Sequence, residues 1–343
     1  MDVRLSPEQV ALRDSAAQVV DRLGPATVAQ LDDAERAGKL DAAVAAAGWR
    51  ELRTATGDGN PWATAVEVAV IAEELGRGLA DAAFLGPTLA ADLRRLAGAP
   101  TATANETVAL GQSLSRLAET DEDVDATAVD AHGASSALLL LADDGDGRLG
   151  VITLGSAIWG ADLTRPVARQ DGERMTALDG QTRVLDADDM ARWQSLGLAA
   201  ACADLVGTMR GALTLATEYA KERKQYGAAI GSFQAVQHLL ADAHVAMEGS
   251  RSIALHAAWA VDALPADDAL AACAAAKAYC ARAARSVCET SIQVHGGIGN
   301  TWECLAHVFL RRALFSTEVL GGIGRNLERV LAARGIGGDD GLR

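Results

Sequence analysis

The sequence has very few lysines and few aromatic residues. Only four of its 31 Lys and Arg residues are lysine, and Phe, Trp and Tyr together make up 4 % of the 343 residues. Basic residues are also outnumbered by 46 Asp and Glu, which gives a formal net charge of −15. A chain with this excess of negative charge is poorly suited to binding phosphate groups. We therefore expect no nucleic-acid partner and no binding to an anionic membrane.

Cysteine is scarce as well, and its pattern excludes two kinds of site. The five cysteines are Cys202, Cys273, Cys280, Cys288 and Cys304. Their odd number and the lack of a C-x-x-C pair argue against a disulfide framework and against a zinc site. The N-terminus has no basic region followed by an apolar one, and no uncharged apolar stretch approaches the roughly 18 residues of a membrane span. We expect reduced core cysteines and a cytoplasmic protein.

What the sequence does contain is apolar surface, since half of its residues are hydrophobic. That proportion excludes wholesale disorder and allows several domains. Residues 1–98 have the pattern of a helical domain, beginning with Ser6 as N-cap, Pro7 in the first turn and Gln9 completing a capping box. Further helical segments are predicted at 27–47 and 63–95, with a turn at 57–61 and a break at Pro87.

The composition changes between residues 101 and 190, where short apolar runs alternate with Asp- and Gly-rich turns. Strand-like runs are found at 107–111, 126–131, 136–142, 149–154 and 181–187. This segment contains 17 acidic residues and six arginines, so 11 of the excess negative charges lie here. We predict a shortened middle β-domain with solvated acidic turns.

Alanine-rich helical sequence dominates from 191 to 334 and leaves a tail at 335–343. The predicted helices lie near 191–220, 234–262, 267–294, 303–316 and 323–334. Small residues recur along one face of the third of these, at Cys273, Ala276, Cys280, Ala284 and Cys288, and predict a closely packed bundle core. The fold class predicted from this order of helices, strands and helices is α+β, mostly α.

Two motifs in the C-terminal part carry more specific information. Residues 222–227 have the sequence ERKQYG and precede G-x-F-Q at 231–234. A second motif, QVHGGIG, lies at 293–299. Paired glycines let the backbone approach a ligand closely, and their N–H groups suit phosphate oxygens. Arg223 and Lys224 also suit the C-terminus of the preceding helix, and this alone explains most basic residues at such positions.

Together, ER-x-x-[FY]-G, G-x-F-Q and Q-x-x-GG-x-G resemble the acyl-CoA dehydrogenase family. The resemblance implies an N-terminal helical domain, a middle β-domain and a C-terminal four-helix bundle, with FAD bound between subunits. Carried over residue by residue, it assigns Arg223 to the FAD pyrophosphate and Tyr226 and Gln234 to the adenosine half. Gln293, Gly296 and Gly297 are assigned to the diphosphate. His295 falls inside the same loop, and we interpret it as a structural histidine.

The resemblance also defines where a catalytic base should lie, and this chain departs from it there. The family's reaction removes the α-proton of an acyl-CoA thioester with a partly desolvated glutamate, while hydride passes to the flavin. One of the family's two glutamate positions corresponds here to Leu320, and the other lies near Gly197 and Leu198. Neither position holds an acid. Glu318 lies two residues away, which on a helix is nearly the opposite face.

The predicted β-domain departs from the family too. No lysine occurs between Lys39 and Lys221, and Trp159 is the only aromatic residue from 101 to 190, so the family's flavin-stacking strand has no counterpart. The pattern is similar to the short, glutamate-lacking β-type subunit of actinobacterial α2β2 steroid side-chain acyl-CoA dehydrogenases. That resemblance implies a longer α-subunit that carries the base and most of the acyl-CoA site, and electron-transfer flavoprotein as the acceptor.

Two alternatives stay open from the sequence. The chain is a self-sufficient homo-oligomeric acyl-CoA dehydrogenase if Glu318 serves as its base. It is a non-catalytic scaffold of the same fold if it binds no FAD in any combination. We predict no catalytic residue in this chain and no metal site.

Overall fold

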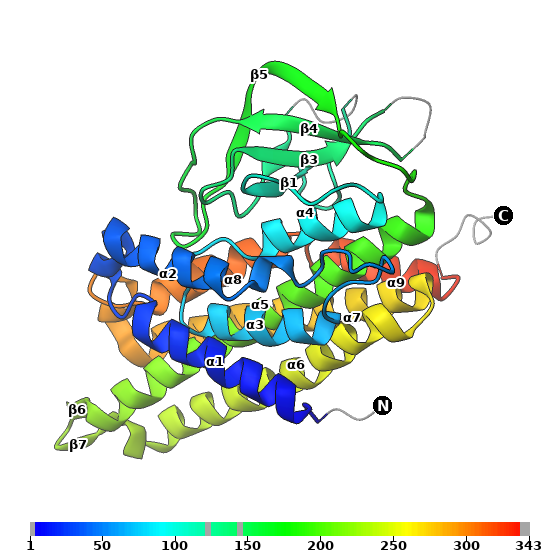
Figure 1. The fold of residues 1–343 in the computed structure, drawn as a ribbon. Coiled ribbons are helices and arrows are strands. Elements are labelled where there is room, and N and C mark those ends of the chain that lie inside the picture. The colour runs from blue at the N-terminus through cyan, green and yellow to red at the C-terminus, as the bar shows by residue number, and fades with distance from the viewer. Residues whose placement is uncertain (1–3, 121–124, 143–146, 337–343) are drawn as a thin grey trace.

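The structure is a computed structural model that describes residues 4–120, 125–142 and 147–336. Figure 1 shows a β-barrel on one side of a larger body of helices, with α4 (Leu85–Leu96) lying between the two. This is the α+β, mostly helical class that the sequence predicts. From residue 337 onward, the predicted tail at 335–343 falls outside the described residues.

The helices that precede the barrel begin with the predicted capping box. They are α1 (Pro7–Leu23), η1 (Val28–Asp32), α2 (Ala34–Ala46), η2 (Trp49–Glu51), α3 (Ala65–Arg77) and α4. Ser6 Oγ accepts from the Gln9 N–H at 3.2 Å, and Gln9 Oε1 accepts from the Ser6 N–H at 2.9 Å. The predicted break at Pro87 is wrong, because this proline lies in the first turn of α4, where a missing N–H has no intrahelical partner to lose.

The barrel is built from short strands that close in the order β1–β2–β5–β4–β3. These strands are β1 (Glu106–Leu110), β2 (Thr127–Ala128), β3 (Ser136–Leu140), β4 (Leu149–Leu154) and β5 (Ala168–Ala177). The predicted strand at 181–187 is wrong, because Asp186 instead caps the next helix by accepting from the Asp189 N–H at 2.8 Å. Strand β5 was missed because most of its residues face solvent and form no apolar run.

The second half of the chain consists of long helices, as the sequence predicts. Its elements are α5 (Ala187–Glu222), β6 (Lys224–Gln225), β7 (Ala228–Ala229), η3 (Ile230–Ser232), α6 (Gln234–Ala263), α7 (Ala266–His295), η4 (Gly296–Asn300), α8 (Ala306–Glu318) and α9 (Ile323–Ala333). The small residues singled out on α7 are all 0 % exposed, so they pack inside this chain. An 18-residue window of α5 is apolar enough to cross a membrane by composition, but 94 % of it is buried inside the chain, which is typical of a core helix.

A buried ion cluster joins the barrel to the helices. Asp204 of α5 accepts from Arg312 Nη2 of α8 at 2.6 Å and from Ser316 Oγ at 2.6 Å. Its other charged neighbour, Arg165, donates to it at 3.3 Å and comes from the segment between β4 and β5. Arg165 also pairs with Asp162 at 2.8 Å, so two buried guanidinium groups are matched by two buried carboxylates. The cluster therefore sets how the barrel is seated on α5 and α8.

We predict that Asp204→Asn lowers the free energy of unfolding by about 3–5 kcal/mol, because two buried guanidinium groups lose their shared counter-charge. Denaturant unfolding at neutral pH measures the loss. Asp125→Asn is the matched control, since its pair with Arg169 is exposed on both sides and contributes about 0–1 kcal/mol. Equal effects of the two substitutions would contradict this role of the cluster.

The same comparison has an expected pH dependence. Burial raises the pKa of the Asp204 carboxyl, but Arg165 and Arg312 outweigh it and hold that pKa below its usual range. Because its pKa is lower in the folded state, the carboxyl group stabilises the fold at pH values above its unfolded-state pKa of about 4. This stabilisation is lost as the pH falls toward the folded-state pKa. The stability difference between wild type and Asp204→Asn should therefore shrink as the pH is lowered from neutral into the acid range.

Candidate functional site

The two sequence positions that the resemblance assigns to a catalytic glutamate lie against each other in the structure. A Cβ atom placed on Gly197 of α5 would stand 2.1 Å from Leu320 Cδ1 and 3.3 Å from a methyl carbon of Leu89. Leu320 follows α8 and is fully buried. The leucine side chain thus occupies the space into which a side chain at position 197 would project, and no carboxylate stands at either position.

The turn that carries Leu320 is closed against a loop of the barrel domain. The Leu320 N–H donates to the Leu114 carbonyl at 2.7 Å, and both residues have left-handed backbones, with φ of 59° and 54°. Arg329 of α9 joins the same two segments, because its guanidinium donates to Leu320 O at 2.7 Å and to Ser115 O at 2.8 Å. A non-glycine residue in this conformation costs about 1–3 kcal/mol, so the surrounding bonds hold the turn in place.

A buried lysine supports the turn from the other side. Lys277 of α7 is fully buried, and its Nζ donates to Val319 O at 2.6 Å and to Thr317 O at 3.1 Å. Burial lowers the pKa of Lys277 to about 8. Glu318, the alternative base from the sequence, is exposed at the end of α8, whereas Leu320 is buried. Its carboxylate therefore lies in water, whereas the family's reaction needs a partly desolvated base.

A second feature is an open hollow of about 500 Å³ at the far end of α5, which we call the hairpin hollow. Its lining residues are Tyr219, Arg223, Gln225, Tyr226, Ile230, Phe233, Val236, Val294, His295, Gly296, Gly297 and Ile298. Figure 1 shows its hairpin, β6 and β7, protruding from the helices at the end away from the barrel.

Local backbone geometry explains why these segments meet. Helix α5 stops because Arg223 takes an extended backbone, with φ −68° and ψ 125°. Tyr226 and Gly227 then both have positive φ, 51° and 81°, as a two-residue turn of a tight hairpin requires. Gly296 ends α7 with φ 66°, and a Cβ on Gly296 or Gly297 would meet no atom within 4 Å. The glycine backbone is therefore exposed to anything that enters the hollow.

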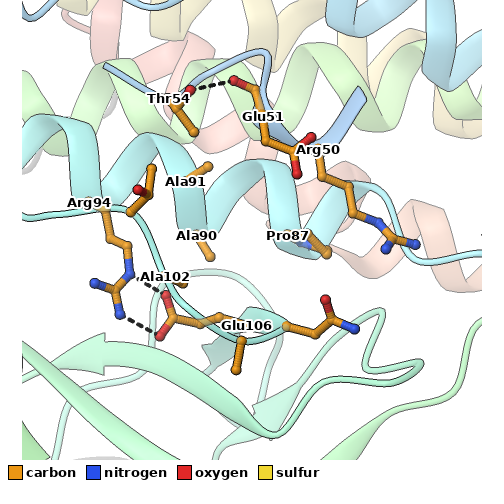
Figure 2. Close-up of a pocket in the computed structure, with 12 residues that line it drawn as sticks. Arg50, Glu51, Thr54, Pro87, Ala90, Ala91, Arg94, Ala102 and Glu106 are labelled. Carbon is orange, nitrogen blue, oxygen red and sulfur yellow. Dashed lines mark hydrogen bonds and ion pairs between the residues drawn. The ribbon is translucent and has the colours of Figure 1, made fainter. Parts of the chain in front are cut away.

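The hairpin hollow has a free cation. Among the residues that the structure describes, no hydrogen-bond or ion-pair partner faces the exposed Arg223 side chain. A hollow of about 110 Å³ between η2, α4 and the chain entering β1 differs in this respect (Figure 2). There Arg94 is held by both oxygens of Glu106, at 2.5 and 2.8 Å, and Arg50 pairs with Asp41. Of these two hollows, the hairpin hollow is the one whose described residues offer an unpaired guanidinium next to open glycine backbone.

The structure brings together four of the six cofactor residues assigned from the resemblance. Arg223, Tyr226, Gly296 and Gly297 all line the hairpin hollow. Gln234 and Gln293 are exposed at its margins, in the first turn of α6 and the last turn of α7, and are not among its lining residues. The assignment missed the apolar walls, Tyr219, Ile230, Phe233, Val236, Val294 and Ile298. Tyr219, Val236 and Val294 lie in helices, where apolar residues are typical of a core, and Ile230, Phe233 and Ile298 lie in the short segments between helices, so no periodicity marks these residues as a site.

Comparison with known proteins supplies the family. Residues 195–334 match the model of the acyl-CoA dehydrogenase C-terminal domain. The acyl-CoA dehydrogenase IpdE2 of Mycobacterium tuberculosis is 32 % identical over 255 residues, which cover 74 % of this chain and 73 % of that protein. The chain belongs to the acyl-CoA dehydrogenase family.

Solved structures agree with this in fold. The Tcur3481–Tcur3483 steroid ACAD G363A variant matches with a TM-score of 0.80 at 22 % identity, over 96 % of this chain and 98 % of that one. The ChsE4–ChsE5 complex from Mycobacterium tuberculosis matches with a TM-score of 0.76 at 22 % identity, over 98 % and 99 % of the two chains.

The family's cofactor is FAD, and the hairpin hollow fits part of it. An unpaired guanidinium and open glycine backbone suit a diphosphate, and aromatic walls suit an adenine ring. Arg223, Gly296 and Gly297 would hold the diphosphate, and Tyr226 would cover the adenosine. When bound, FAD supplies the two-electron acceptor of this family's chemistry.

We predict that Gly197→Ala destabilises the chain by about 1–3 kcal/mol, because its new methyl group overlaps Leu320 in a packed core. Leu320→Ala alone should remove about 2–5 kcal/mol by leaving a cavity. The double variant should lose clearly less than the sum of the two, since each change makes room for the other. Denaturant unfolding of all four proteins measures the coupling.

Gly38→Ala is the matched control for this cycle. Gly38 is exposed in α2, and a Cβ there meets nothing within 4 Å, so the substitution should stabilise the chain by up to about 1 kcal/mol. Additive effects at positions 197 and 320 would show that these two residues do not share one space.

Proposed function

We propose that this chain is the β-type, non-basic subunit of a heteromeric FAD-dependent acyl-CoA dehydrogenase of the cytoplasm. The enzyme introduces an α,β double bond into an acyl-CoA thioester. This subunit lends the pyrophosphate and adenosine half of the FAD site, and a longer α-subunit supplies the base glutamate and most of the acyl-CoA site. Electron-transfer flavoprotein accepts the electrons.

One observation carries the proposal, namely the contact between Gly197 and Leu320. A thioester α-carbon must come within reach of a carboxylate for its proton to be removed. Here both glutamate positions are apolar, and the space between them is filled by the Leu320 side chain. The hydrogen bond from Leu320 to Leu114 closes the same place from the barrel side. This supports the proposal that the base for proton abstraction comes from another chain.

The position of the hairpin hollow supports the division of the FAD site. The hollow lies at the end of α5 and α6 away from this chain's barrel (Figure 1). Tyr226 is 95 % exposed there, and Phe233 and Ile298 also present apolar surface to solvent. An exposed aromatic beside a free guanidinium is suited to a ligand whose other half is held by a partner.

The names of the similar proteins support the substrate class. One matching structure is described as a steroid ACAD and another as a complex of two differently named chains, ChsE4 and ChsE5. We propose a steroid side-chain CoA thioester as the substrate. A large, rigid acyl group is consistent with a site built mainly by the longer partner.

We predict that the isolated chain has no acyl-CoA dehydrogenase activity with a dye acceptor and retains little or no FAD. Co-expression with a longer acyl-CoA dehydrogenase that has an intact base glutamate should give a yellow, active complex. Turnover by the isolated chain that disappears in Glu318→Gln would instead establish a self-sufficient enzyme. A colourless complex would establish a scaffold without redox function.

We predict that Arg223→Ala weakens FAD retention in the complex without unfolding it. Loss of a charge-assisted hydrogen bond to phosphate removes roughly 1.5–3 kcal/mol, which corresponds to about ten- to a hundredfold in affinity. The dissociation rate of flavin, followed by fluorescence, measures the effect. Lys224→Ala is the matched control. It also removes one positive charge, but Lys224 is the next residue along the chain and is not among those that line the hollow. Unchanged flavin dissociation in Arg223→Ala would contradict the assignment.

A further inference from the structure

The carboxylate of Asp130 is buried at the place where the barrel meets the helices. Asp130 follows β2 and is 3 % exposed. Its Oδ2 atom accepts from the N–H groups of Phe84 and Gly86, at 2.7 and 3.3 Å. These N–H groups lie at the start of α4, where the helix itself supplies no carbonyl to bind them. One oxygen of this barrel residue therefore caps the helix that separates the barrel from the other helices.

The other oxygen of Asp130 is an acceptor without a donor. Oδ1 is buried and has no hydrogen-bond partner among the residues that the structure describes. The two bonds to Oδ2 hold the carboxylate in place, so Oδ1 cannot turn toward solvent. A buried polar atom gives up its hydration on folding, and leaving it unpaired is costly. A donor from outside the chain is therefore expected at Oδ1.

Asp130 lines a small cavity that has room for such a donor. The cavity has a volume of about 10 Å³, and all the residues that line it are buried. One side is formed by apolar side chains of α3, α4, α5 and the segment that leads into α4. The other side is formed by Asp130, Arg165, Asp204 and Arg312. This volume is about what a single water molecule needs, and it is too small for a larger ligand.

The charged side of the cavity also has donors that are not yet used. Nη1 of Arg165 and Nη2 of Arg312 each carry two N–H groups. Among the described residues each of these nitrogens makes one hydrogen bond, to Asp204 at 3.3 and 2.6 Å. Asp204 itself accepts four bonds, two from Arg312 and one each from Arg165 and Ser316, so its oxygens have no capacity left. The wall thus combines one unpaired acceptor with two spare donors.

We propose that this cavity is a binding site for one water molecule, which donates to Asp130 Oδ1 and accepts from the guanidinium group of Arg165 or Arg312. Water suits the site because it donates and accepts at once. A metal cation cannot accept an N–H bond, and the two guanidinium groups in the same wall repel it. The site needs neither the flavin nor a partner subunit.

The bound water connects two parts of the structure. It joins the carboxylate that caps α4 to the ion cluster around Asp204, so one hydrogen-bond network runs from α4 through the barrel residue Asp130 to α5 and α8. Because all the lining residues are buried, the water exchanges with solvent only when the chain opens locally at this place. Its residence is therefore much longer than that of a surface water.

The first test is a high-resolution crystal structure of the full-length wild-type chain. One ordered water should lie about 2.6–3.2 Å from Asp130 Oδ1 and at a similar distance from a guanidinium nitrogen of Arg165 or Arg312. An empty cavity, a direct ion pair between Asp130 Oδ1 and a guanidinium group, or a metal ion surrounded by several oxygens would each overturn the proposal.

The second test counts long-lived internal waters in solution by oxygen-17 magnetic relaxation dispersion. Ala200→Val puts a larger side chain into the cavity wall and should lower the count by one. Ala203→Val is the matched control, since Ala203 is buried in the same helix but does not line the cavity, and it should leave the count unchanged.

Melting curves establish that both variants are folded. An unchanged count in folded Ala200→Val, or the same loss in the control, would contradict a water at this site. If Ala200→Val does not fold, Ala72→Val fills the cavity from α3 and takes its place with the same expectations. The wild-type crystal structure decides the question without any variant.

Discussion

The arrangement of this protein depends on the Asp204 carboxylate at the centre of its core. Asp204 binds guanidinium groups from α8 and from the barrel domain, and Arg312 continues from there to the Ala80 carbonyl at 2.9 Å. Buried charges are tolerated only when they are paired and hydrogen-bonded. The barrel, α5, α8 and the segment after α3 can therefore take only the relative placement in which all these charges are matched.

In this arrangement, the N-terminal part of α5 is packed against Leu320, whereas its C-terminal end borders the open hairpin hollow. In its N-terminal third, α5 presents Gly197 to Leu320, and the turn around Leu320 is held by bonds from α7, α9 and the barrel loop. At its C-terminal end, α5 stops at Arg223 and leaves a guanidinium and glycine backbone facing solvent. The resemblance assigns proton abstraction in this family to the closed place, and the proposed function assigns half of the cofactor to the open one. This agrees with the proposed role of the chain, which is to contribute binding surface while the partner contributes the base.

Leu320 and Leu114, which are joined where this turn meets the barrel loop, both have a left-handed backbone. Such strain persists only where the surroundings over-determine it, and here the two strained residues are hydrogen-bonded to each other. Glu318, two residues earlier, is exposed to solvent at the end of α8. The turn therefore keeps its left-handed backbone, and the side chains of Val319 and Leu320 pack in the core.

The sequence by itself determined the helices, the apolar identity of both glutamate positions and the motifs of the hairpin hollow. These features depend on residues near one another in the chain, such as the capping box at Ser6 and the paired glycines at 296 and 297. The contact of Leu320 with Gly197 and the pairing of Asp204 with Arg312 join residues more than a hundred positions apart, and no local periodicity encodes such pairings. Strand β5 escaped prediction because only tertiary pairing with β2 and β4 makes its polar, exposed sequence a strand. Only the tertiary structure decided that one site is filled and the other is open, because that depends on which side chains share a volume.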